Sequence, residues 1–156
     1  MNTSELNSKW AFDLHLNLDR TQIQPIGEVG TKKRTIVPIS GGRFEGPTMK
    51  GLVLPGGADW VSINPDGNFE IDVRLTLKTA EKELIYLSYQ GVFWADEPSL
   101  KKYYKGELLN ENQCYIRTVL KFETSSSRLS RLNQRLFIGK GSQTPSGVKY
   151  AIFEVQ

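Results

Sequence analysis

Apolar and polar residues alternate with a period of two along most of the chain, a pattern typical of half-buried β-strands. Near the start, the alternating residues Trp10, Phe12, Leu14 and Leu16 share one face of a predicted strand. The longest alternation runs from Asn68 to Thr79, with aliphatic residues on one face and charged residues on the other. Each such segment is expected to bury one face and expose the other.

Turn signals separate the predicted strands, and helix signals are few. Strands are predicted at residues 10–17, 33–39, 48–54, 60–63, 68–79, 84–93, 113–123, 136–139 and 148–155. Two short helices are predicted, at Pro98–Lys105 and Ser127–Gln134. Many short strands with turns between them indicate an all-β fold, an antiparallel barrel or sandwich. We expect residues 1–8 to be frayed and residues 9–156 to form a single domain.

A glycine-rich stretch lies between residues 41 and 67. It holds seven glycines, and its charged and aromatic residues include Arg43, Phe44, Glu45, Asp59 and Trp60. Glycine is costly inside a strand, so it marks bends, bulges and close approaches of the backbone. This stretch therefore favours the wall and rim of a small antiparallel β-barrel, with the short helices near its mouth.

Composition excludes several functional classes. The chain has 156 residues and a net charge of +3, and we expect its short basic runs, Lys32–Arg34 and the lysines at 101, 102 and 105, to be solvated faces. No nucleic-acid partner is expected. No segment resembles a signal peptide or a membrane span, so we expect a cytoplasmic protein with no membrane partner.

Few residues could serve cofactor, metal or nucleophile chemistry. His15 and Cys114 are the sole histidine and cysteine. A zinc site or a histidine-based triad is therefore not expected, and neither is a disulfide. The stretch Gly139–Ser142 lacks the spacing of a phosphate-binding loop. We expect no cofactor and no metal.

Two glycine motifs resemble those of a known family. The chain reads G-G-R-F-E-G at residues 41–46 and P-G-G-A-D-W at residues 55–60. Together they resemble domain-of-unknown-function family 3237, also named uncharacterised protein family 0311, and the likeness covers nearly the whole chain. The resemblance implies a single-domain antiparallel β-barrel that often self-associates, with no one established activity. This chain departs from the family pattern near Arg128 and Arg131, where the barrel mouth could be lined.

The strongest candidate site is the polar face of the strand at residues 68–79. Glu70, Asp72 and Arg74 point to the same side because they are two residues apart. The row either faces water or lines the barrel lumen, and the pattern leaves both open. If it lines the lumen, Tyr86, Tyr115 and Arg117 on neighbouring strands could converge on it. We assign catalytic roles to Glu70, Asp72, Arg74 and Tyr86 on this reading.

Further residues are candidates for substrate binding. Glu45, Asp59 and Trp60 could form a pocket rim at the glycine corners, although Asp59 could instead cap its own turn. The remaining candidates are Phe44, Tyr115, Arg117, Glu123 and Asn133.

Three functions fit these residues. The first is a cofactor-free isomerase, cyclase or lyase, in which a carboxylate moves a proton next to the carbonyl of an apolar small molecule. The second is a non-catalytic barrel that binds or carries a small ligand. The third is a structural homo-oligomer, with a dimer as the first expectation, whose interface uses the row from Glu70 to Arg74.

Overall fold

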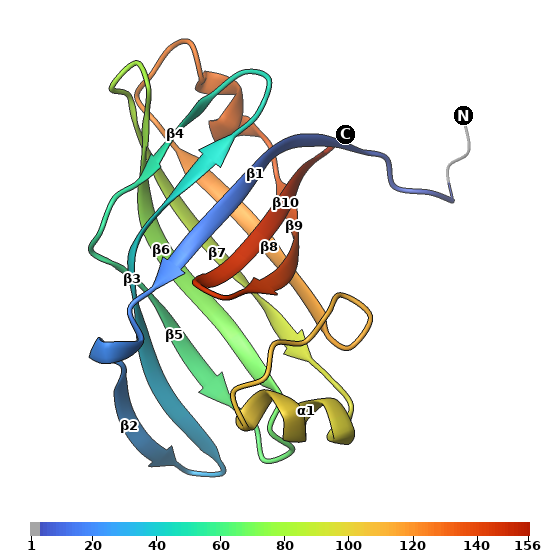
Figure 1. Ribbon diagram of the computed structural model, residues 1–156. Helices are drawn as coiled ribbons and strands as arrows, with labels where there is room; N and C mark the ends of the chain where they lie inside the picture. Colours follow the sequence, from blue (N-terminus) through green and yellow to red (C-terminus); the bar gives the residue numbers. More distant parts are fainter. Residues whose placement is uncertain (1–3) are drawn as a thin grey trace.

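The computed structural model describes residues 4–156 as a closed antiparallel β-barrel (Figure 1). The strands are β1 (Ser8–Leu18), β2 (Gln24–Val29), β3 (Lys32–Glu45), β4 (Lys50–Val53), β5 (Gly57–Ile63), β6 (Phe69–Thr79), β7 (Leu84–Trp94), β8 (Tyr115–Glu123), β9 (Phe137–Thr144) and β10 (Gly147–Val155). The helical segments are α1 (Glu97–Tyr104) and two 3₁₀ turns, η1 (Arg20–Gln22) and η2 (Ser130–Gln134). In this part of the chain, no helix is long and apolar enough to cross a membrane.

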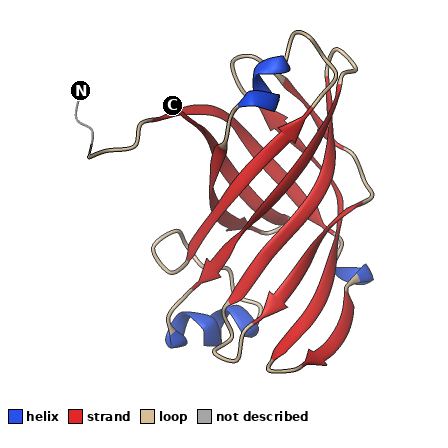
Figure 2. Cartoon of the chain, turned by 180° about the vertical axis from the view of Figure 1, so that it is seen from behind, coloured by secondary structure: helices blue, strands red, loops and turns tan. Residues whose placement is uncertain are grey.

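Pairing of β1 with two partners closes the sheet. The strands follow the order β1-β10-β9-β8-β7-β6-β4-β3-β2, and β1 also pairs with β3. β4 and β5 both pair with β3 on one side and β6 on the other, so they act as two halves of one interrupted strand. Counted in this way, eight strands form the barrel. The strands are tilted relative to the barrel axis (Figure 2).

A glycine allows this closure. Gly42 on β3 lies opposite Leu16 on β1. A Cβ atom at this position would collide with the backbone of His15 and Leu16. Glycine therefore lets β1 approach β3 closely enough for the ladder to form. The strand predicted at residues 33–39 therefore does not end before Gly41 and Gly42, and β3 continues through them to Glu45.

The inward faces of the barrel strands are largely apolar. Along β6 the buried residues are Ile71, Val73, Leu75, Leu77 and Thr79, and the residues between them are exposed or half-buried. At the end of the barrel near β4 and η2, aromatic rings fill the interior: Phe12 contacts Phe44 and Phe122, and Phe122 contacts Phe137. This end is a packed core.

The other end carries α1 and η1 beside the hairpin of β2 and β3 (Figure 1). β2 was not predicted, because Pro25 and Gly27 are poor strand residues; the structure tolerates them on an edge strand that pairs with β3 alone. The helix predicted at Pro98–Lys105 is α1. The one predicted at Ser127–Gln134 is the short 3₁₀ turn η2, which lies at the opposite, aromatic end.

Two further expectations need adjustment. The strand predicted at residues 136–139 is longer than expected, because β9 continues to Thr144 and only Pro145 and Ser146 separate it from β10. Of the expected frayed start, residues 1–3 lie outside the described residues, and Ser8 already begins β1. The antiparallel β-barrel itself is confirmed.

The inward and outward faces of β6 predict different responses to mutation. Leu77 is fully buried and its neighbour Lys78 is exposed. We expect Leu77→Ala to lower the free energy of unfolding by about 2–5 kcal/mol through the cavity it leaves, and Lys78→Ala to change it by less than about 0.5 kcal/mol. Urea denaturation measures both. Equal losses from the two variants would contradict the assigned inward face.

Candidate functional site

A cavity of about 260 Å³ lies inside the barrel at the α1 end. Most of its wall is aliphatic or aromatic, with inward side chains such as Val61, Ile71, Val73, Phe93 and Ile116. The polar groups that line it are few: Arg20, Thr35, Asp59, Tyr89, Tyr103, Tyr104, Gln143 and Tyr150. An apolar cavity with a few converging polar groups is the usual form of a small-molecule site.

Among the described residues that line the cavity, Asp59 alone is acidic. It lies on β5, where Asp59, Val61 and Ile63 alternate into the barrel. The ladder between β5 and β6 pairs Asp59 with Val73 and resumes only at Ser62 and Glu70. In this gap the backbone N–H of Asp72 donates to Asp59 Oδ1 at 3.1 Å. The carboxyl group is therefore held in place by a backbone donor that the sheet leaves unused.

Burial changes the acidity of this carboxyl group. Removal from water raises the pKa of Asp59 from 3.8 to about 7, and the charge of Asp72 adds to the rise. The hydrogen bond from the Asp72 backbone opposes it but is the weaker influence. Near neutral pH, Asp59 is thus present in both its protonated and ionised forms. Such a group can take up a proton or give one at the same pH.

Two tyrosines lie close to Asp59 in the barrel interior. Tyr89 on β7 and Tyr150 on β10 are buried, and their rings meet edge to face with centroids 5.4 Å apart. Burial and the charge of Asp59 raise the pKa of both hydroxyl groups, so both stay protonated. The two hydroxyl groups interact through one hydrogen bond in which either can be the donor, so one hydroxyl proton of the pair remains for a ligand.

Two glycines on β9 make room for the Tyr150 ring. Gly141 lies directly opposite Tyr150, and Gly139 is two residues along on the same face. A Cβ atom on Gly141 would lie 2.8 Å from the Tyr150 ring, and one on Gly139 would lie 3.2 Å from it. The residues Gly139–Ser142, which lack the spacing of a phosphate loop, therefore serve to seat a buried tyrosine.

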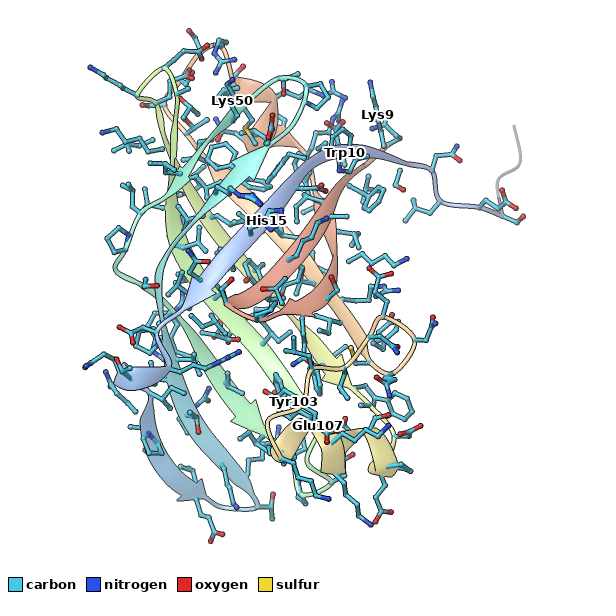
Figure 3. The ribbon with its side chains drawn as sticks, in the orientation of Figure 1. Lys9, Trp10, His15, Lys50, Tyr103 and Glu107 are labelled. Carbon is cyan, nitrogen blue, oxygen red and sulfur yellow. The ribbon has the colours of Figure 1, made fainter. Side chains whose placement is uncertain are left out.

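The mouth of the cavity, at the end of the barrel beside α1 and η1, is held by an aromatic stack. Phe69 and Phe93 stack with ring centroids 4.3 Å apart, and Tyr103 of α1 packs against Phe93 at 5.1 Å. The Tyr104 hydroxyl donates to the Gly67 carbonyl oxygen at 2.7 Å. Figure 3 shows Tyr103 at this end, far from Lys50 at the opposite end. α1 is thereby fixed at the cavity mouth.

The charged row on β6 lies on the outside of the barrel. Glu70 and Arg74 are exposed, Asp72 is half-buried, and the buried residues Ile71 and Val73 between them line the cavity. Glu70 forms an exposed ion pair with Lys32 at 3.2 Å, and the Arg74 guanidinium lies over the Trp60 ring. Of the two alternatives left open by the sequence, the structure shows the one in which this row faces water. The reason is that the aliphatic face fills the interior.

The other predicted residues lie at separate places away from the cavity. Tyr86, Glu123 and Asn133 meet at a shallow hollow on the outer surface, where Asn133 binds the backbone of Thr124 through both its amide atoms. Arg117 stacks on Tyr115 on the outer face of β8. Of the predicted site residues, Asp59 alone lines the cavity.

Four further residues singled out from the sequence also lie away from the cavity: Phe44, Glu45, Arg128 and Arg131. Phe44 belongs to the packed aromatic end and Glu45 is exposed. Arg128 pairs with Glu81 and Glu83, and Arg131 pairs with Glu154, so both serve ion pairs at the η2 end. Sequence reasoning missed Tyr89, Tyr150 and Arg20. In residues 4–156, no group of three His, Cys, Asp or Glu side chains is placed to hold a metal ion.

The fold and its cavity define a class: closed antiparallel β-barrels with one apolar, tyrosine-lined internal site. The chain belongs to the family of proteins of unknown function DUF3237, whose model matches residues 6–155. The resemblance seen in the glycine motifs is thus confirmed.

Relatives match along almost the whole chain. A UPF0311 protein of Rhodopseudomonas palustris is 29% identical, over 98% of this chain and 99% of that one. A UPF0311 protein of Clostridium acetobutylicum is 27% identical, over 99% and 97%. These relatives share the family and do not name an activity.

Solved structures agree with the fold. A conserved protein of unknown function from R. palustris superposes with a TM-score of 0.92 at 29% identity, covering 97% of this chain and 99% of that one. A β-barrel-like protein from Acinetobacter baumannii gives 0.85 at 30% identity, covering 99% of each. An enzyme from Penicillium herquei gives 0.72 at 16% identity, covering 100% and 98%, and this likeness shows the fold alone.

The raised pKa of Asp59 predicts a pH dependence of stability. Because the folded state holds this proton more tightly than the unfolded state, Asp59 contributes stability below about pH 4, which is lost as the pH rises through about 7. From pH 4 to 8, the wild type should lose stability relative to Asp59→Asn, by at most roughly 4 kcal/mol. Urea unfolding at several pH values measures the difference.

Asp66 provides the opposite control. Hydrogen bonds from Asn68 lower the pKa of Asp66, so its contribution should be lost as the pH falls. Asp66→Asn should therefore destabilise the protein near neutral pH and not in acid. A difference between wild type and Asp59→Asn that does not change with pH would refute the assignment of Asp59 as the titrating group.

The seat of Tyr150 predicts a steric effect. Gly141→Ala should push the Tyr150 ring and the Ile116 side chain from their places and lower the free energy of unfolding by about 1–3 kcal/mol. Lys140→Ala, on the exposed outer face of the same strand, is the matched control and should have little effect. If the alanine at position 141 is tolerated without loss, the ring is not held by this strand.

Proposed function

We propose that this protein is a cofactor-free enzyme, an isomerase, cyclase or lyase that acts on an apolar small molecule bearing a carbonyl group. The observation that carries the proposal is the position of Asp59. This carboxyl group is a single acid in an apolar cavity, with a pKa of about 7 and two protonated tyrosines nearby. Perturbed carboxyl groups of this kind in a cavity favour acid–base function.

The chemistry assigned to Asp59 is proton transfer next to a carbonyl. In its ionised form the carboxylate removes a proton from the carbon beside the carbonyl, and the electron pair moves to the carbonyl oxygen. In its protonated form it returns the proton at another position. Because Asp72 donates to Oδ1 through its backbone, Oδ2 is the oxygen we assign to the reaction.

Tyr150 is the group we assign to the developing enolate. The hydrogen bond between Tyr89 and Tyr150 uses one hydroxyl proton, and we assign the remaining proton to Tyr150, which donates it to a substrate oxygen. A donor that is already oriented in a site sheltered from water stabilises developing negative charge more effectively than water does. The pair of tyrosines thus supplies the electrophile, and Asp59 supplies the base.

The cavity wall also supports a second function, a barrel that binds a small apolar ligand without altering it. The lining is largely aliphatic and aromatic, as in ligand-carrying barrels. This alternative needs the cavity but not the carboxyl group of Asp59. Replacing Asp59 therefore separates the two functions.

Deuterium exchange tests the enzyme proposal directly. The purified protein is incubated in D₂O with enolisable ketones such as 2-tetralone and butyrophenone, and deuterium at the carbon beside the carbonyl is measured by mass spectrometry. We expect wild-type protein to accelerate exchange. Asp59→Asn should reduce the rate about 100-fold or more, and Tyr150→Phe about 10-fold or more.

Asp72→Asn is the matched control. Asp72 is an outer-face carboxylate, and its substitution keeps the backbone N–H that binds Asp59. We expect this variant to retain most of the exchange rate, because the Asp72 charge is the smallest of the named influences on the pKa of Asp59. Equal losses from Asp72→Asn and Asp59→Asn would return the catalytic role to the outer row. Tight ligand binding by both wild type and Asp59→Asn, with no exchange, would favour the carrier.

A further inference from the structure

Arg20 is the one cationic residue among the described residues that line the cavity. It begins η1 at the mouth, and its Nη1 donates to the Pro145 carbonyl oxygen at 3.3 Å. No carboxylate pairs with it in the described part of the chain. The adjacent Asp19 instead accepts from the backbone N–H and the hydroxyl of Thr21. Most donors of this guanidinium are therefore open to a ligand.

A second donor lies on the same side of the mouth. Gln143 is on β9, two residues before Pro145, and also lines the cavity. Its Oε1 accepts from the Leu109 backbone N–H at 2.9 Å. Since an N–H must meet an oxygen, this bond fixes the orientation of the amide, and the NH₂ group is the part left for the cavity. An arginine and an amide NH₂ together form a site for a planar oxyanion.

The two polar centres of the cavity are separate. Asp59 and Arg20 form no ion pair, and Arg20 is not among the causes of the altered acidity of Asp59. Apolar side chains such as Val37, Phe69 and Ile71 line the wall they share. A molecule with an anionic group at one end and a carbonyl group at the other matches this arrangement. A cationic ligand would be disfavoured, because the positive charge of Arg20 at the mouth would repel it.

We propose that the ligand of this cavity is an apolar monocarboxylate, whose carboxylate is bound at the mouth by Arg20 and Gln143. This inference rests on the proposed function and names its substrate class: a keto acid whose carbonyl lies toward Asp59 and Tyr150 while its carboxylate stays at the mouth. Arg20 is then a residue that determines specificity, and it takes no part in the proton transfer.

A matched series of probes tests the substrate class. The probes are 4-oxo-4-phenylbutanoate, its methyl ester, and butyrophenone, which share the aryl ketone and differ at the far end. Isothermal titration calorimetry at low ionic strength measures their affinities. We expect the acid to bind about 10-fold tighter than the ester or the ketone, and the preference to shrink with added salt.

Variants at Arg20 test the source of that preference. Arg20→Gln should abolish it, weakening the acid about 10-fold and leaving butyrophenone unchanged, and Arg20→Lys should restore part of it. Lys101→Gln removes an exposed cation of α1 that does not line the cavity, and it should keep the wild-type preference. Equal affinities for all three probes, or a preference that survives in Arg20→Gln, would overturn the inference, as would failure of the acid to bind at millimolar concentration.

The exchange assay keeps this inference distinct from the proposed function. Arg20-dependent binding of the acid without exchange would support the ligand class and count against the enzyme. Exchange in butyrophenone as fast as in the acid, unchanged by Arg20→Gln, would support the enzyme and overturn the ligand class. Exchange that is faster for the acid in wild type alone would support both.

Discussion

The rest of the structure depends on the pairing of β1 with both β10 and β3. This double pairing closes the sheet into a barrel, beyond which only β2 remains as an edge strand, and it separates an inside from an outside. Once the sheet is closed, strand alternation places every second side chain in a space sheltered from water. The burial of Tyr89 and Tyr150, and the partial burial of Asp59, follow from that separation. Gly42, at the seam, allows the two backbones to come close enough.

The unusual acidity of Asp59 then has a simple origin. An isolated carboxylate is costly to bury, and here one hydrogen bond from a backbone N–H compensates only in part. That donor exists because the ladder between β5 and β6 opens beside Asp59. The same irregularity therefore places the carboxyl group and limits how well it is solvated. This gap in the ladder thus affects both the position of Asp59 and its pKa.

The sequence predicted the strands well because their alternation is local. The regular segments at residues 68–79 and 84–93 correspond closely to β6 and β7. β2 was missed because Pro25 and Gly27 weaken the local signal, and only pairing with β3 makes that segment a strand. The extension of β3 through Gly41 and Gly42 also depends on a distant partner, β1.

The site was harder to predict because alternation shows which residues share a face and not where that face points. On β6 the charged face is conspicuous, yet the apolar face with Ile71 and Val73 lines the cavity. On β7 both faces carry a tyrosine, and the register with β6 decides between them: Tyr89 lies opposite the inward Val73, and Tyr86 opposite the outward Thr76. Asp59 could be predicted as a site residue because it closely follows the glycines at positions 56 and 57, which mark a bend of the chain. Tyr150 could not be selected from the sequence, because only the register of β10 with β9 places Gly139 and Gly141 beside its ring.

The aromatic plug at the η2 end has a consequence for turnover. Because Phe12, Phe44, Phe122 and Phe137 pack together at that end and do not line the cavity, we expect a ligand to enter and leave at the α1 end. Whatever enters must reverse its path to leave, so two molecules cannot pass through in succession. A product molecule would then block the next substrate, and the rate of turnover would depend on product release at the α1 end as much as on proton transfer at Asp59.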